Sequence, residues 1–290
     1  MKRVLYASNG AGPARQAGLL LRRFADPQKV RVTVNVCESV EFAFAQEGWS
    51  YGQQRKSRPQ PAEVAETELA ALQADGFEAD SYLGSGVPAL QILEKIKDGN
   101  YDIALLGAGS TRWLDNFLLG STSTRVLHSC ESSVLIVHNF AGAEGPVRVL
   151  LATDRSEDSA VAVGQLIATG DPKKVTVKVV SVADAVPTIR RLIPEGLTPP
   201  EVGNFLQEAA RKSAELAAQP LRDAGFQVEV ACPTGDPVKE ILELARDADL
   251  VVCGSSGMGG ASRLLLGSVS DHLARLAPAT LVCRKPEAGE

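Results

Sequence analysis

Short apolar runs recur along the chain and alternate with segments of helical periodicity. In the second half these runs are rich in valine and apolar at consecutive positions, which is typical of parallel strands covered on both faces. They are the segments VRVLLAT, KVTVKVVSV, FQVEVA, ADLVVCG and ATLVCR. Because helical segments separate them, the pattern predicts an α/β fold with a doubly wound sheet.

One helical segment shows the expected period clearly. Asp236 is predicted to be its N-cap, and Pro237 occupies the first helical position. The apolar positions that follow fall on one face of a helix. They are Val238, Ile241, Leu242 and Ala245.

The whole alternation occurs twice, which indicates an internal duplication. RVLYASNGAG, starting at Arg3, matches RVLLATDRSE, starting at Arg148, 145 residues later. Farther along, ADGFEADSYLGSGVPALQILEKI matches DAGFQVEVACPTGDPVKEILELA at a separation of 149. The last glycines pair at 147, so the first half carries two additional residues near 98–100. We expect two domains, 1–140 and 147–290, with the small, Pro-terminated segment 141–146 as linker.

A glycine-rich stretch, GSSGMGGASRLLLGS, follows the fourth predicted strand of the second half, from Gly254 to Ser268. Glycines let the loop turn sharply and let a ligand approach the backbone. Ser268 and Asp271 fit the capping pattern of a helix start, where free N–H groups favour phosphate. The stretch therefore predicts a nucleotide or another phosphate ligand beyond the carboxyl ends of the strands. The alternative is a glycine-rich connection followed by an ordinary capped helix.

These residues resemble those of the universal stress protein family, in both halves of the chain. Its nucleotide-binding members share the motif G-2x-G-9x-G-[ST], which GSSGMGGASRLLLGS matches in full, and a first strand that ends in D-x-S, as in LLATDRS. The resemblance implies two tandem doubly wound domains of the adenine nucleotide alpha hydrolase-like fold. Each would hold a five-stranded parallel sheet with helices on both faces. The implied ligand is ATP with Mg²⁺ on its phosphates.

The resemblance also implies which residues of the second half bind ATP. The end of the first strand would contact adenosine, the first two glycines would pass under ribose and phosphates, and the helix start would hold the phosphates. For Asp154, helix capping is an alternative role. The implied residues are Ala152, Asp154, Val182, Gly254, Gly257, Gly267, Ser268, Val269 and Ser270.

The first half departs from this motif. Asn9 stands in place of Asp154 and can accept a hydrogen bond, but without charge. Ser110 replaces the second glycine and adds a Cβ where we expect the loop to need a positive φ. Whether this half binds nucleotide stays open. Its candidate residues are Asn9, Gly107, Ser110, Gly120, Ser121 and Thr122.

Composition excludes several classes of protein. A net charge of −5 over 290 residues argues against non-specific nucleic-acid binding. No apolar run approaches the ~18 residues of a membrane helix, and the start lacks a signal-peptide pattern. The five cysteines form no C-x-x-C and have no histidine cluster, so we expect reduced thiols in a cytoplasmic protein and no metal site.

Three functions remain open. The first is an ATP-binding regulator of the stress response, acting through nucleotide-dependent conformation or assembly. The second is a slow ATPase or nucleotidyl-transfer enzyme, although the glycine stretches offer no lysine and no catalytic residue can be assigned. The third is a nucleotide-free scaffold. A protein partner and a homodimer are also left open, and the aromatic cluster Phe42, Phe44, Trp49 and Tyr51 is either a partner surface or internal packing.

Overall fold

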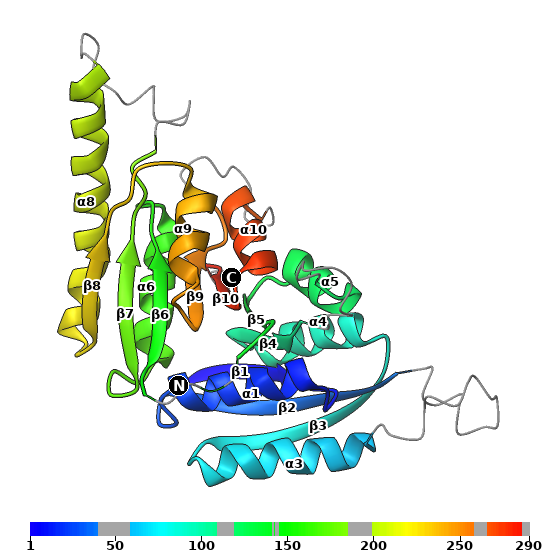
Figure 1. Ribbon diagram of the computed structural model, residues 1–290. Helices are drawn as coiled ribbons and strands as arrows, with labels where there is room; N and C mark the ends of the chain where they lie inside the picture. Colours follow the sequence, from blue (N-terminus) through cyan, green and yellow to red (C-terminus); the bar gives the residue numbers. More distant parts are fainter. Residues whose placement is uncertain are drawn as a thin grey trace. The chain divides into compact units, whose positions relative to one another are not determined.

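The computed structural model describes residues 1–39, 59–108, 119–140, 142, 145–184, 199–257 and 266–285. The chain divides into two compact units, unit 1 at Met1–Gly142 and unit 2 at Ala143–Lys285 (Figure 1). The aromatic cluster at 42–51 and Ser110 lie outside the described residues. Each unit is described by itself below.

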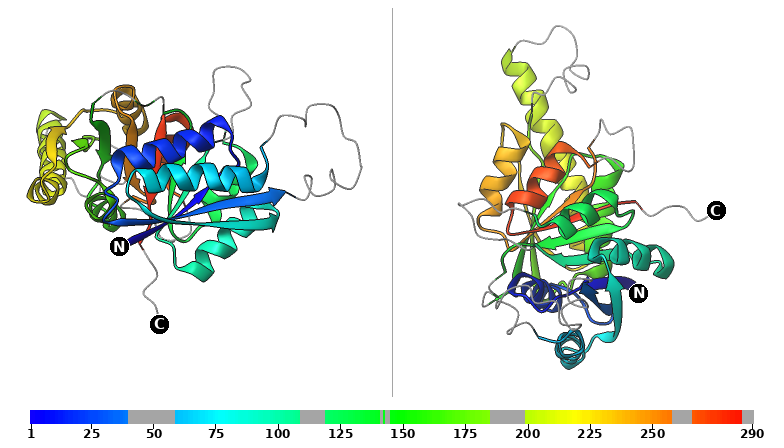
Figure 2. Two further views of the ribbon diagram at one scale, coloured as in Figure 1. Left: turned by 90° about the horizontal axis from the view of Figure 1, so that it is seen from below. Right: turned by 90° about the vertical axis from the view of Figure 1, so that its right-hand side faces the viewer.

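Unit 1 contains a parallel sheet in the order β3-β2-β1-β4-β5. Helices α1 and α3 pack together on one face, and α4 and α5 on the other; Figure 2 (left) shows α1 and α3 on the face opposite α4. The elements are β1 Lys2–Ala7, α1 Gly12–Phe24, β2 Val30–Ser39, α3 Pro61–Ala74, β3 Glu78–Gly86, α4 Pro88–Gly99, β4 Ile103–Gly107, α5 Ser121–Ser129 and β5 Ser133–Val137.

Unit 2 repeats this arrangement with the order β10-β9-β6-β7-β8, again all parallel. Helices α6 and α8 pack together, as do α9 and α10. The elements are β6 Val147–Ala152, α6 Glu157–Thr169, β7 Val175–Val180, α8 Pro199–Asp223, β8 Gln227–Ala231, α9 Pro237–Ala245, β9 Leu250–Gly254, α10 Ser268–Leu276 and β10 Ala279–Cys283. The predicted fold class, two tandem five-stranded parallel sheets with helices on both faces, is confirmed.

Helix α9 begins as its sequence predicts. The Asp236 side chain accepts a hydrogen bond from the Lys239 N–H at 2.9 Å, and Pro237 is the first helical residue. Ile241 and Ala245 are buried on the predicted face. The corresponding helix of unit 1, α4, has 12 residues instead of 9, so the two additional residues of the first half lengthen this helix.

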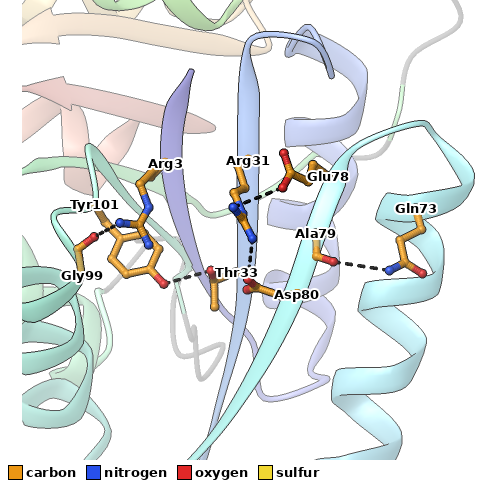
Figure 3. A network of polar contacts seen from close by, with 9 residues as sticks. All are labelled: Arg3, Arg31, Thr33, Gln73, Glu78, Ala79, Asp80, Gly99 and Tyr101. Carbon is orange, nitrogen blue, oxygen red and sulfur yellow. Dashed lines mark hydrogen bonds and ion pairs between the residues drawn. The ribbon is translucent and has the colours of Figure 1, made fainter.

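The amino ends of the strands in unit 1 are tied together by polar contacts (Figure 3). The Arg3 guanidinium lies 4.7 Å from the centre of the Tyr101 ring and donates to the Gly99 carbonyl. The Tyr101 hydroxyl donates to Thr33 Oγ1 at 2.9 Å, and Arg31 forms ion pairs with two acidic side chains of β3. These contacts hold four neighbouring segments at the edge that lies opposite the candidate site.

Candidate functional site

The strand order of unit 2 creates a switch point between β6 and β9. From β6 the chain runs outward through β7 to β8, and it then returns to β9 on the other side of β6. Open α/β sheets bind ligands at such a point, beyond the carboxyl ends of the strands. The turn at 153–156 and the glycine loop, defined as residues 254–267 between β9 and α10, both start at this carboxyl edge.

Asp154 lies in the turn that follows β6. Its Oδ1 accepts a hydrogen bond from the Ser156 N–H at 3.0 Å, and the Ser156 side chain caps α6 by accepting from the Ser159 N–H at 3.1 Å. The side-chain cap of α6 is therefore Ser156, and Asp154 shapes the turn that leads into the helix. This local bond orients the Asp154 carboxylate at the carboxyl edge.

Gly257 faces this carboxylate. A Cβ added to Gly257 would lie 2.8 Å from Asp154 Oδ2, so the missing side chain lets the glycine loop and the β6 turn approach each other. The left-handed residues of the described backbone do not include Gly257, whereas the expected positive φ at position 110 concerns a residue outside the described part of the chain. The requirement for glycine here is spatial: a side chain would displace the Asp154 carboxylate.

Gly254 allows a different close approach. Its added Cβ would meet the Asp158 carbonyl carbon at 2.7 Å and the Ser159 nitrogen at 2.9 Å. The first turn of α6 therefore lies directly against the end of β9. Gly254 serves this packing of helix against strand in addition to any ligand contact.

Asp158 anchors the start of the glycine loop. Its Oδ2 accepts hydrogen bonds from Ser255 Oγ at 2.7 Å, from Ser256 Oγ at 2.6 Å and from the Ser256 N–H at 3.0 Å. Sequence reasoning missed this residue. The available signal was an acidic side chain in the first turn of α6 and a serine pair directly after β9, two segments that only the fold brings together.

The far end of the glycine loop is the start of α10. Gly267 is the N-cap and donates its N–H to the Ser255 carbonyl at 2.8 Å. The predicted Ser268–Asp271 capping pair is wrong: the N-cap makes no side-chain hydrogen bond, and Asp271 accepts instead from Arg275 at 2.9 Å. The reason is that the Gly267 bond to Ser255 starts the helix one residue earlier.

The helix start presents a mixed surface. Ser268 is exposed and Val269 is half-buried, whereas Ser270 is buried and donates to the Ser255 carbonyl at 2.8 Å. The first N–H groups of a helix have no acceptor within the helix, so the Ser268 and Val269 backbone and the Ser268 hydroxyl are the groups best placed for an anion. The buried Ser270 hydroxyl thus fixes the start of the glycine loop through its bond to the Ser255 carbonyl.

The remaining candidates of unit 2 lie at the same edge. Ala152 ends β6 and is buried, and Val182 follows β7 and is half-buried. The Thr153 N–H donates to the Val180 carbonyl at 2.9 Å, which keeps the two strand ends adjacent. The fold thus brings all the candidate residues of unit 2 to one carboxyl edge.

Unit 1 keeps part of this arrangement. Asn9 Oδ1 accepts from the Ala11 N–H at 3.0 Å, the same turn that Asp154 makes without its charge. A Cβ on Gly107 would lie 2.3 Å from the Ala14 nitrogen, so the helix again packs on the strand end. Gly120 is the N-cap of α5, whose first residues, 121 and 122, are exposed and half-buried, respectively.

Two thiols beside the site, those of Cys253 and Cys283, are buried. Burial raises the pKa of Cys253 to about 12, and the Asp154 carboxylate adds to this shift. Burial also raises the pKa of Cys283 well above its usual value, so both thiols stay protonated near neutral pH. Arg284, which follows β10, is buried and lowers both pKa values in part.

Within the described part of the chain, no group of three or more His, Cys, Asp or Glu side chains could hold a metal ion. His128 and His272 are exposed on α5 and α10. Among the same residues, every helix is too short or too polar to cross a membrane.

Comparisons with known proteins agree with this architecture. The universal stress protein family model matches residues 1–138 and 147–284. A universal stress protein of Mycolicibacterium smegmatis is 32% identical over 175 residues, which make up 60% of this chain and 58% of that relative. Universal stress protein MJ0577 of Methanocaldococcus jannaschii is 34% identical over 89 residues, 29% of this chain and 55% of the relative. The chain therefore spans less than two thirds of the length of either.

A solved structure supports the fold over nearly the full chain. The crystal structure of a universal stress protein from Archaeoglobus fulgidus has a TM-score of 0.65 and 20% identity, and the match covers 97% of this chain and 98% of that one. The expected resemblance is thus confirmed by both sequence and fold. The chain belongs to the universal stress protein family, with one match to the family model in each half.

Proposed function

We propose that unit 2 binds ATP at its carboxyl edge and that binding regulates a cytoplasmic stress response through the protein's conformation or assembly. The observation that carries the proposal is the meeting of three groups at the switch point: the Asp154 carboxylate, the bare backbone at Gly257 and the first turn of α10. The Asp154 turn precedes the other two groups by roughly a hundred residues in sequence. The glycine motif, which spans the last two of these groups, is complete in unit 2.

The chemistry of these groups suits the parts of ATP. A carboxylate accepts hydrogen bonds from ribose hydroxyls, and free helical N–H groups with a serine hydroxyl donate to phosphates. The absent Cβ at Gly257 leaves the loop backbone bare beside Asp154. We propose that Mg²⁺ is held by the phosphates of the nucleotide, without a cluster of protein ligands.

The described groups favour binding over turnover. Asp158 accepts hydrogen bonds from Ser255 and Ser256, and we assign Asp154 to the ribose hydroxyls. An efficient phosphoryl transfer needs a base placed for its nucleophile and a cation at the γ-phosphate. A regulator that binds ATP differently in two states needs neither.

The first experiment is to denature the purified full chain and to count the released nucleotide by chromatography. We expect about one ATP per chain, from unit 2. Two would show that unit 1 also binds in spite of Asn9 and Ser110. None, together with an unchanged melting temperature on adding ATP and Mg²⁺, would overturn the proposal and favour a scaffold.

Substitutions in both units test which of them binds ATP. Asp154→Asn gives unit 2 the residue of unit 1 and should weaken ATP binding about tenfold, because a charged acceptor becomes neutral. Gly257→Val combined with Ser268→Ala should abolish binding, and Ser121→Ala in unit 1 is the matched control that should not. Unchanged affinity in the double variant would refute the assignment. Multiple turnover well above trace, lost on changing one acidic residue, would indicate an enzyme instead.

A further inference from the structure

Unit 2 contains a groove between α6 and α8 that adjoins the proposed ATP site at the β6 turn. Its volume is about 480 Å³, within the range of small-molecule pockets. Most of its wall is apolar and comes from both helices: Ala160, Val163, Ile167, Leu216, Ala217 and Pro220. Its polar end lies at the β6 turn, where Thr153, Arg155 and Ser156 line it.

A glycine inside α6 and a proline inside α8 line the groove, although both residue types are unfavourable within helices. Gly164 lies in the middle of α6, has an ordinary helical φ, and an added Cβ would meet nothing within 4 Å. Neither close packing nor backbone conformation therefore requires glycine at this position. Pro220 lies inside α8 and has no N–H, so the regular helical hydrogen bond to the Leu216 carbonyl is not made. Gly164 thus leaves space in the groove, and Pro220 leaves the Leu216 carbonyl without its helical donor.

Ser213 is a buried polar group in the same wall. It is 4% exposed, and its hydroxyl has no hydrogen-bond partner among the residues that the structure describes. A buried hydroxyl without a partner is costly, and it calls for an occupant that can bond to it. Because Ser213 lines the groove, a molecule in the groove can supply that bond.

Arg155 stands at the polar end with a strained backbone. Its φ is +70°, a left-handed conformation that side-chain-bearing residues rarely adopt. The guanidinium is exposed and makes no ion pair with the described carboxylates. The groove thus presents one unpaired cation at its mouth and apolar walls behind it.

The corresponding place in unit 1 is packed shut. By the repeat, Gly10 stands at the position of Arg155, with the same φ of +70°, and Val64 at the position of Ser213. A Cβ on Gly10 would lie only 2.8 Å from Val64 Cγ2, and Glu68 of α3 accepts from the Ser8 hydroxyl at 3.2 Å. The duplicated fold closes with glycine and valine here, so arginine and serine in unit 2 mark a departure that opens the groove.

We propose that this groove is a second ligand site, which binds a monocarboxylate with an unbranched apolar chain of medium length. The carboxylate would pair with Arg155 at the β6 turn and accept a hydrogen bond from the Ser213 hydroxyl, and the chain would lie between α6 and α8. The groove adjoins the proposed ATP site at the β6 turn, but the ligand proposed here binds without nucleotide.

The test is calorimetric titration of the full chain, without nucleotide, with hexanoate, octanoate and decanoate. Affinity should rise about fourfold per added methylene as the chain fills the groove. Arg155→Gly, which restores the residue of unit 1 and relieves the strained φ, should weaken decanoate about fivefold and leave decanol unchanged. Equal binding of decanol and decanoate to the unmodified protein would refute the role of Arg155.

Gly164→Leu fills the groove from α6 and should abolish decanoate binding. The matched control is Gly203→Leu on α8, where an added Cβ also meets nothing within 4 Å but which does not line the groove. Both substitutions replace a helical glycine, so thermal melting verifies that both variants are folded. Absent binding in the unmodified protein, or equal decanoate affinity in both variants, would overturn the proposal.

Discussion

The two units have sheets with the same strand order and differ at the carboxyl edge of that sheet. In unit 2, Asp158 holds the glycine loop through three hydrogen bonds to Ser255 and Ser256. In unit 1 the matching positions are Pro13 and Ala108, which offer no such bonds. Strand order and the helix-to-strand contact at the first glycine are the same in both. The close packing of helix on strand and the polar contacts of the loop are therefore separate features, and unit 1 keeps the first without the second.

The largest expected effect tests what the units share. Gly107→Ala and Gly254→Ala each force a Cβ into backbone atoms at 2.3 and 2.7 Å, respectively. Each should lower the free energy of unfolding of its own unit by up to about 3 kcal/mol through overpacking. Urea unfolding followed by circular dichroism measures the loss, and hydrogen exchange assigns it to a unit. A loss under about 0.5 kcal/mol in either variant would contradict the shared requirement.

A somewhat smaller effect tests what separates the units. Asp158→Ala removes the acceptor of three hydrogen bonds, so unit 2 should lose about 2 kcal/mol of unfolding free energy. The amides of Ser255 and Ser256 should then exchange faster. Pro13→Ala at the equivalent position of unit 1 is the control and should change the amide exchange rate of Ala108 little. Equal protection of the serine amides before and after Asp158→Ala would show that the loop does not need this anchor.

The effect that is smallest at neutral pH appears in the alkaline range. Cys253 has its pKa raised to about 12 by burial, and unit 1 has the buried Leu106 at this position. Because the unfolded thiol ionises near pH 8.5 and the folded one near 12, the folded state binds more protons in this window. Stability therefore falls as pH rises from about 8.5 to 12, by about 1.4 kcal/mol per pH unit at most from this group.

The variant Cys253→Ala should flatten that decline. Unfolding free energies at pH 8, 9 and 10 measure it, with Cys232→Ala, at a half-buried position, as control. An unchanged slope in Cys253→Ala would remove this thiol from the alkaline transition.

The sequence was sufficient for the architecture but insufficient for the contacts at the site. Valine-rich runs and the Asp236–Pro237 helix start depend on local patterns, and both appear in the structure. The prediction of a Ser268–Asp271 cap was wrong because the Gly267 N–H donates to the Ser255 carbonyl, outside the helix, and Gly267 becomes the N-cap. Asp158 was missed for a related reason, since its partners lie 97 and 98 residues away. Local propensity predicts elements, whereas contacts between elements require the assembled fold.

The left-handed Arg155 was equally beyond sequence reasoning. Arginine gives no local signal for a positive φ, and only the alignment with Gly10 in the folded repeat makes the conformation understandable. The roles of individual site residues in binding ATP stay predictions, because they concern a ligand and not the chain alone.

The central place of the first strand in each sheet has a consequence for synthesis of the protein. β1 and β6 come first in their units but gain their second neighbours, β4 and β9, only about a hundred residues later; the Arg3–Asp102 and Arg148–Asp249 bonds span 99 and 101 residues. A ribosome must therefore release most of a unit before its middle strand can be flanked on both sides. Such long-range closure slows folding and leaves an apolar strand edge open meanwhile. Each half of the nascent chain thus keeps one edge of its middle strand unpaired until nearly the full half has been synthesised.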